Sequence, residues 1–293
     1  MSEREILRAF GGMETMDGAG VRLIRLFGNR ETRLFDPFLL LDLFGSEDPD
    51  QYLPGFPWHP HRGIETVTYM LDGSVRHGDS MGNSGFIGPG DVQWMTAGSG
   101  IVHEEMPQPS PLGIRGFQLW VNLPRAEKMR DPAYRGFSAS QMPVERIPGG
   151  EVRVIAGSFG PARGPVQGLA RQPTYLDVRL GNEGTVELEA PRGETAFACV
   201  YEGSLEGPAL PARAGGEGDR RRATPLCCLF GEGDSVRMRA GSEGCSFIFA
   251  SGRPLGESVA WRGPIVMNTE AELDLAFREY SEGSFVKKRG SSA

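Results

Sequence analysis

The stretch WHPHRGIETVTYML at residues 58–71 carries the strongest structural signal of the chain. From residue 65 to residue 71 it reads as a run of the kind that forms a β-strand. If residues 59–69 form one strand, His59, His61 and Glu65 lie on the same face, because side chains alternate across a strand. The stretch therefore predicts a β-strand that presents two imidazoles to one space.

Short runs of the same kind recur along the chain with turn signals between them, such as Asp72-Gly73 and Pro148-Gly149-Gly150. The 42 glycines and 22 prolines of the 293 residues suit many short strands joined by tight turns. This pattern indicates an all-β protein, either a sandwich or a barrel. The further runs are Val21–Leu26, Gln93–Met95, Phe117–Asn122, Val152–Ala156, Thr174–Leu180, Ala196–Tyr201, Cys227–Phe230, Ser235–Met238 and Ser246–Ala250.

A faint internal repeat suggests two copies of one β-barrel. The turn at 88–92, GPGDV, is echoed at 231–236 by GEGDSV, and a length of 293 residues accommodates two domains. We place the boundary in the charged, proline-containing stretch 125–147, so that residues 1–135 form the first domain and 136–293 the second. A capping box of Thr269 and Glu272 predicts a C-terminal helix over about 269–281.

Composition excludes several classes of protein. A formal net charge of −7 argues against a protein whose task is to grip nucleic acid. The N-terminus is charged and lacks an apolar signal segment, and the apolar stretch 37–41 is too short to span a membrane. The four cysteines include no Cys-x-x-Cys pair, which favours buried reduced thiols. We expect a cytoplasmic protein.

All four histidines lie between residues 59 and 103, so a histidine-based metal site can form only in the first half. His103 and Glu105 share a face of a second expected strand, which gives three imidazoles and one carboxylate from two strands. Such a set suits a divalent ion with open positions for water, O₂ or substrate. Alternation leaves open whether Glu65 or Glu105 supplies the acid. We interpret His77 as a residue at the rim rather than a ligand.

Five segments resemble the pirin family of the cupin superfamily. They are Gly55–Leu71, Pro89–Pro107, Gly116–Pro124, Asp36–Asp42 and Gly263–Thr269. The resemblance implies a bicupin of two face-to-face, jelly-roll-type β-barrels with metal only in the N-terminal one, held by His59, His61, His103 and Glu105. It favours Glu105 over Glu65 as the acid and leaves Glu65 to orient a ligand. It also implies one divalent ion, Fe(II) first, with Mn, Ni, Co, Cu and Zn as alternatives.

The resemblance implies two kinds of function. The first is quercetin 2,3-dioxygenase activity, in which a flavonol is opened to a depside and CO and Glu105 takes the proton of the 3-hydroxyl. The second is a redox- or metal-responsive regulator that acts through a protein partner, as a transcription cofactor or a modulator of metabolic enzymes. A flat aromatic substrate needs an apolar pocket. The expected lining residues are Phe56, Trp58, Ile87, Trp94 and Met95.

Overall fold

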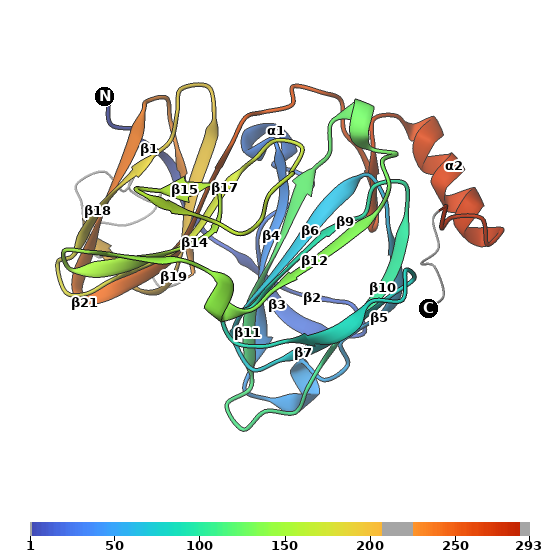
Figure 1. Ribbon diagram of the computed structural model, residues 1–293, viewed down its shortest axis with the longest axis horizontal. Coiled ribbons are helices and arrows are strands. Elements are labelled where there is room, and N and C mark those ends of the chain that lie inside the picture. Colours follow the sequence, from blue (N-terminus) through green and yellow to red (C-terminus); the bar gives the residue numbers. More distant parts are fainter. Residues whose placement is uncertain (1, 207–224, 288–293) are drawn as a thin grey trace. The chain divides into compact units, whose positions relative to one another are not determined.

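The computed structural model describes residues 2–206 and 225–287, which form two compact, strand-rich units (Figure 1). One unit holds residues 13–139 and 255–293, and the other holds residues 1–12 and 140–254. We call them the histidine unit and the second unit, because all four histidines belong to the first.

The histidine unit contains a seven-stranded antiparallel sheet in the order β12-β9-β6-β11-β4-β3-β2. Its inner strand β6 is buried over nearly its whole length, which explains the almost continuous apolar and threonine-rich run seen in the sequence. The strands are β2 (Met13–Asp17), β3 (Val21–Phe27), β4 (Phe38–Ser46), β6 (Ile64–Asp72), β9 (Val92–Thr96), β11 (Ile114–Asn122) and β12 (Ala133–Phe137).

A second sheet of the histidine unit contains four antiparallel strands in the order β5-β10-β7-β8. Its strand β10 alternates strictly between buried and half-buried residues, so one face of the sheet points inward. Thr68 of β6 hydrogen-bonds Glu105 of β10, which shows that the inward faces of the two sheets meet. The strands are β5 (Phe56–His61), β7 (Val75–Asp79), β8 (Ser84–Ile87) and β10 (Ile101–Pro107).

The C-terminal segment completes the histidine unit. The strand pair β22 (Ala260–Arg262) and β23 (Ile265–Met267) carries helix α2 (Glu270–Ser281), whose buried residues Leu273 and Ala276 face the pair. The expected capping box is present, since Thr269 and Glu272 bond each other's backbone amides. The unit also contains the short helix α1 (Thr32–Phe35) and the 3₁₀ turns η1 (Pro49–Gln51) and η2 (Arg125–Glu127).

The second unit is built on one eight-stranded antiparallel sheet in the order β1-β20-β19-β21-β17-β14-β13, with β18 paired to β21. Its core is apolar throughout, with Val178, Phe247 and Phe249 among its members. The strands are β1 (Ile6–Gly11), β13 (Val144–Ile147), β14 (Gly150–Ala156), β17 (Thr174–Leu180), β18 (Thr185–Glu189), β19 (Thr195–Glu206), β20 (Leu226–Phe230) and β21 (Ser235–Gly252). The small pair β15 (Ser158–Phe159) and β16 (Ala162–Arg163) and the turn η3 (Ala139–Gln141) complete the described elements.

The all-β prediction with a C-terminal helix is confirmed. Two details differ from the sequence expectations. The runs Ser235–Met238 and Ser246–Ala250 belong to the single long strand β21, which continues through Gly244. The two units also do not follow chain order, as a division at residue 135 would. The N-terminal strand β1 belongs to the second unit, where it pairs with β20. The C-terminal helix α2 belongs to the histidine unit, where it packs on β22 and β23.

All four cysteines are buried and none forms a disulfide, as the sequence suggested. Within residues 2–206 and 225–287, no helix is long and apolar enough to cross a membrane.

Candidate metal centre

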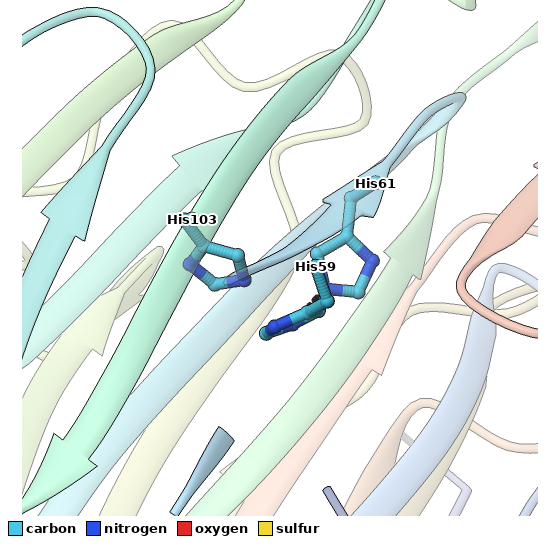
Figure 2. A group of neighbouring side chains, drawn as sticks. All are labelled: His59, His61 and His103. Atoms are coloured by element: carbon cyan, nitrogen blue, oxygen red, sulfur yellow. Dashed lines mark hydrogen bonds between the residues drawn. The ribbon is translucent and has the colours of Figure 1, made fainter. Parts of the chain in front are cut away.

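Three imidazoles meet on the inward face of the four-stranded sheet (Figure 2). His59 of β5 lies directly opposite His103 of β10 in the strand register, and His61 follows His59 by two residues on the same face. One nitrogen of each ring lies within 4.8 Å of the others. This group could hold a metal ion.

Backbone carbonyls fix the tautomers of His59 and His61. The Nδ1 atom of His59 lies 2.9 Å from the carbonyl oxygen of Pro57, and that of His61 lies 2.9 Å from the carbonyl oxygen of Pro264. Because a carbonyl only accepts hydrogen bonds, each Nδ1 carries the proton, and each neutral ring offers its Nε2 lone pair. These two Nε2 atoms lie 3.1 Å apart. Two lone pairs at that distance repel unless a cation lies between them.

Burial disfavours a proton as that cation. Desolvation, reinforced by the neighbouring His59, lowers the pKa of His61 to about 3. Desolvation also lowers the pKa of His103, with His59 and His61 adding to the effect. Neither ring nitrogen of the fully buried His103 has a hydrogen-bond partner among the described residues. Imidazole nitrogens are common ligands of transition-metal ions, and His103 has a buried nitrogen without a hydrogen-bond partner beside the rings of His59 and His61. The three residues therefore fit such an ion.

The structure brings Glu105 into the space beside the histidines. Glu105 follows His103 by two residues on β10, lies opposite Phe56 and His77 in the register, and lines the same cavity as His59 and His61. Its Oε1 atom accepts a 2.7 Å hydrogen bond from Thr68. Glu105 therefore lines the cavity with His59 and His61, but it lies outside the group of three imidazoles whose nitrogens lie within 4.8 Å of one another.

Glu65 lies elsewhere, because residues 59–69 do not form one strand. Strand β5 ends at His61 and β6 begins at Ile64, and Gly63 between them adopts a positive φ of 80°. A side chain at Gly63 would collide with the carbonyl oxygen of Val266. The alternation that placed Glu65 in phase with the histidines is thus broken. The Glu65 carboxylate instead accepts hydrogen bonds from Trp94 Nε1 and Thr96 Oγ1, and burial raises its pKa.

His77 lies outside the group of three. The expectation of a rim position is wrong, because His77 is fully buried. Its ring stacks on Tyr134 at a centroid distance of 4.9 Å and lies 5.6 Å from the His103 ring. Its Nε2 atom is 3.5 Å from a carboxylate oxygen of Asp79. His77 therefore packs behind His103.

A cavity of about 580 Å³ adjoins His59, His61 and Glu105. Its aromatic walls come from Phe44, Phe56, Trp120 and Trp261, the two tryptophans lying 5.6 Å apart between ring centroids. The polar lining includes Gln118, Asp42, Arg25 and Asp17. A volume in this range is typical of sites for small organic molecules.

The cavity lining corrects most of the sequence expectation. Of the five side chains proposed, Phe56 lines the cavity. Trp58 is 53% exposed, Ile87 and Met95 belong to separate apolar clusters, and Trp94 bonds Glu65. Sequence reasoning missed Trp120, because alternation along β11 did not reveal which face is inward.

A charged network closes one part of the cavity. Arg25 donates from Nε and Nη2 to both oxygens of Asp42 at 2.9 and 2.7 Å, and Nη2 also reaches Asp17 at 2.8 Å. Hydrogen bonding to Asp42 raises the pKa of Arg25, whereas burial raises the pKa of Asp42 to about 6. The raised pKa of Arg25 favours a charged pair, whereas the raised pKa of Asp42 favours a neutral carboxyl group. The two hydrogen bonds from one guanidinium to both carboxylate oxygens favour the charged pair at neutral pH. Because the network contains two carboxylates and one guanidinium, it favours ligands that offer hydrogen-bond donors.

Two buried basic side chains hold the segments that carry the centre, and nothing in the sequence pattern marks them. Lys128 Nζ donates to the carbonyl oxygens of Gly63 and Val266, at 2.8 and 3.0 Å, and to Asn122 Oδ1 at 2.7 Å. Arg62, between His61 and Gly63, pairs with Glu279 of α2 at 2.7 Å. These contacts tie the end of β5 to the segment whose Pro264 carbonyl orients His61.

Comparisons with known proteins agree with this architecture. The family model "Pirin" matches residues 20–121, and the model "Pirin C-terminal cupin domain" matches residues 175–286. The chain is 46% identical to a "Pirin-like protein" of Caulobacter vibrioides over 97% of this chain and 100% of that protein. It is 37% identical to "Pirin" of Rattus norvegicus, covering 95% of this chain and 92% of that one.

Solved structures give the same result. A crystal structure of quercetin 2,3-dioxygenase from Acinetobacter baumannii superimposes with a TM-score of 0.86 at 32% identity, over 97% of this chain and 99% of that one.

Proposed function

This chain belongs to the pirin family, and from that premise we propose that it is a metal-dependent quercetin 2,3-dioxygenase, which opens a flavonol with O₂ and releases CO. The observation that carries the proposal is the cavity of about 580 Å³ whose aromatic walls share its lining with His59, His61 and Glu105, the two histidines belonging to the group of three imidazoles that could hold a metal ion. The similarity to a protein that is itself named a quercetin 2,3-dioxygenase supports the choice of reaction.

We assign the metal ligands as His59, His61, His103 and Glu105, with Fe(II) as the ion. Three imidazoles and one carboxylate leave positions of an octahedral ion open, and the absence of thiolates from the set disfavours a structural zinc site. A bound divalent ion would supply a Lewis acid that lowers the pKa of a hydroxyl placed on it.

The residues of the chain then have separate tasks. Trp120 and Trp261 contact the flat ring system and keep water from its faces. Glu105 accepts the proton of the flavonol 3-hydroxyl, since it lines the cavity together with His59 and His61. Arg25, Asp42 and Gln118 face the polar groups of the substrate.

The reaction balances without an external reductant. The C2–C3 and C3–C4 bonds of the flavonol break, C3 leaves as CO with its own oxygen, and the two atoms of O₂ bond to C2 and C4. Every atom of the flavonol and of O₂ is thus present in the depside and CO. The reaction therefore needs no reductant.

The test is anaerobic loading with iron followed by quercetin in air, with flavonol absorbance and CO release as readouts and Glu105→Ala alongside. Turnover that requires both iron and Glu105 supports the proposal. Tight iron binding without CO would refute it and shift the search to a protein partner whose affinity depends on the redox state of the iron. The cytoplasmic location expected from the sequence remains part of the proposal.

A further inference from the structure

Glu105 is connected to the opposite sheet through one hydroxyl group. Thr68 Oγ1 lies 2.7 Å from Glu105 Oε1 and 2.9 Å from Gln118 Oε1. Thr68 and Gln118 face each other across β6 and β11, and Thr68 is only 2% exposed. The contact thus spans the interior of the histidine unit from the seven-stranded sheet to the strand that carries His103.

Proton counting gives this contact a direction. A threonine hydroxyl has one proton, whereas a carboxylate and an amide oxygen both require one. The charged carboxylate is the stronger acceptor, so the Thr68 proton goes to Glu105. The oxygen and nitrogen of an amide are assigned from their hydrogen bonds, and a Gln118 that turns its NH₂ toward Thr68 satisfies all three groups. The chain of donors then runs from Gln118 to Thr68 to Glu105.

We propose that Thr68 is a positioning residue for Glu105, and that Gln118 holds the Thr68 hydroxyl in its donating orientation. Thr68 occupies Oε1, which leaves Oε2 as the oxygen that Glu105 offers to an ion or to a substrate proton. The inference rests on the proposed function in placing Glu105 at the metal. Because Gln118 also lines the cavity, a ligand that bonds Gln118 acts on Glu105 through Thr68.

The same strand contains a matched control. Thr66 lies two residues before Thr68 on the same face of β6 and is 1% exposed. Its hydroxyl has no hydrogen-bond partner among the residues that the structure describes. Replacing either threonine by valine keeps the branched shape and removes one hydroxyl, so a difference between the two variants reports the hydrogen bond rather than packing.

The experiment uses Co(II) as the probe on the full-length protein. Its dissociation constant is measured by competition with a chelator, and its visible spectrum reports the ligand set. Thr68→Val is expected to weaken Co(II) binding about 10- to 100-fold, the usual effect of losing a partner that orients a metal ligand, and to change the spectrum. Thr68→Ser restores both, and Thr66→Val leaves both unchanged.

A double-mutant cycle with Glu105→Gln identifies the route of the effect. If Thr68 acts through Glu105, Thr68→Val has little further effect once Glu105 is neutral. Wild-type affinity and spectrum in Thr68→Val would overturn the proposal, as would an equal loss in the presence and absence of Glu105→Gln. If Thr68→Val fails to fold, Gln118→Leu replaces it, with a smaller loss expected and an unchanged affinity counting against the proposal.

This test does not depend on turnover. A protein that releases no CO yet shows the coupling between Thr68 and Glu105 would refute the dioxygenase and keep the positioning role. A protein that turns over quercetin without this coupling would support the dioxygenase and refute the positioning role.

Discussion

Lys128 offers the most direct test of how the end of β5, which carries His59 and His61, is held. Its side chain is 1% exposed, and its Nζ donates to Gly63, Val266 and Asn122. The Lys128→Met variant keeps a long unbranched side chain of similar volume and removes the donors. Three buried oxygen atoms then lose the hydrogen bonds that the three N–H donors of the protonated amine make to them.

The expected cost follows from those three acceptors. A buried acceptor left without its donor costs about 1–3 kcal/mol. The lower end applies here, because the Gly63 carbonyl also accepts from the amide of Leu123 at 3.4 Å. The sum is about 3 kcal/mol of unfolding free energy. The loss also loosens the end of β5, so metal affinity should fall with it.

Urea unfolding followed by tryptophan fluorescence measures this cost, because all four tryptophans belong to the histidine unit. The control is Lys287→Met, since Lys287 Nζ donates to Ser284 and Glu279 from a side chain that is 37% exposed. Surface pairs of that kind contribute less than about 1 kcal/mol. A Lys128→Met protein within about 1 kcal/mol of wild type would refute the reasoning.

Three further predictions concern the centre and its cavity. His61→Ala should abolish tight metal binding and leave a folded protein, whereas His77→Ala should retain the metal; metal analysis of the purified variants would expose a wrong ligand set if the results were reversed. The metal-free protein should lose stability as pH falls from about 6.5 to about 3, because the unfolded chain there binds a proton at His61 that the folded chain, with a pKa of about 3, does not. The slope for this imidazole is about 1.4 kcal/mol per pH unit, so urea titrations at several pH values should show a slope steeper by about that amount in wild type than in His61→Ala, where the lowered pKa of His103 still contributes. Trp261→Ala should weaken flavonol binding to the nickel-loaded protein about 10-fold or more through lost aromatic contact, whereas the exposed Trp58→Ala should bind normally in the same fluorescence titration.

The sequence was most informative where a local pattern decides the structure. The strand Thr174–Leu180 matches β17 in full, and the capping box of Thr269 and Glu272 fixes the start of α2. The shared face of His59 and His61 followed from the His-x-His pattern, which needs only strand alternation. Such features are set by neighbours two to four residues apart.

Alternation failed where the chain leaves the regular strand. Gly63 has a positive φ, and one such residue was enough to move Glu65 from the expected face to a contact with Trp94 and Thr96. The sequence does contain a glycine at this position, but its effect depends on the nearby Val266 carbonyl, which lies about two hundred residues away. The face of a strand beyond a glycine therefore requires tertiary information.

Long-range contacts account for the other omissions. Trp261 and the Pro264 carbonyl come from a C-terminal segment that chain order assigned to the second domain, yet they complete the cavity beside the histidines. Lys128 gives no sequence signal, because a buried lysine is rare and two of its three acceptors, Gly63 and Val266, are distant in sequence. His77 was expected at the rim, since a lone histidine is usually exposed, but Tyr134 covers it.

The proposed dioxygenase activity would insert both atoms of O₂ into a flavonol. The most direct measurement is mass spectrometry of the products after the iron-loaded protein reacts with quercetin under ¹⁸O₂. We expect a depside that carries two ¹⁸O atoms, together with unlabelled CO, and neither product in Glu105→Ala. An unlabelled or singly labelled depside, or loss of quercetin without CO, would contradict it.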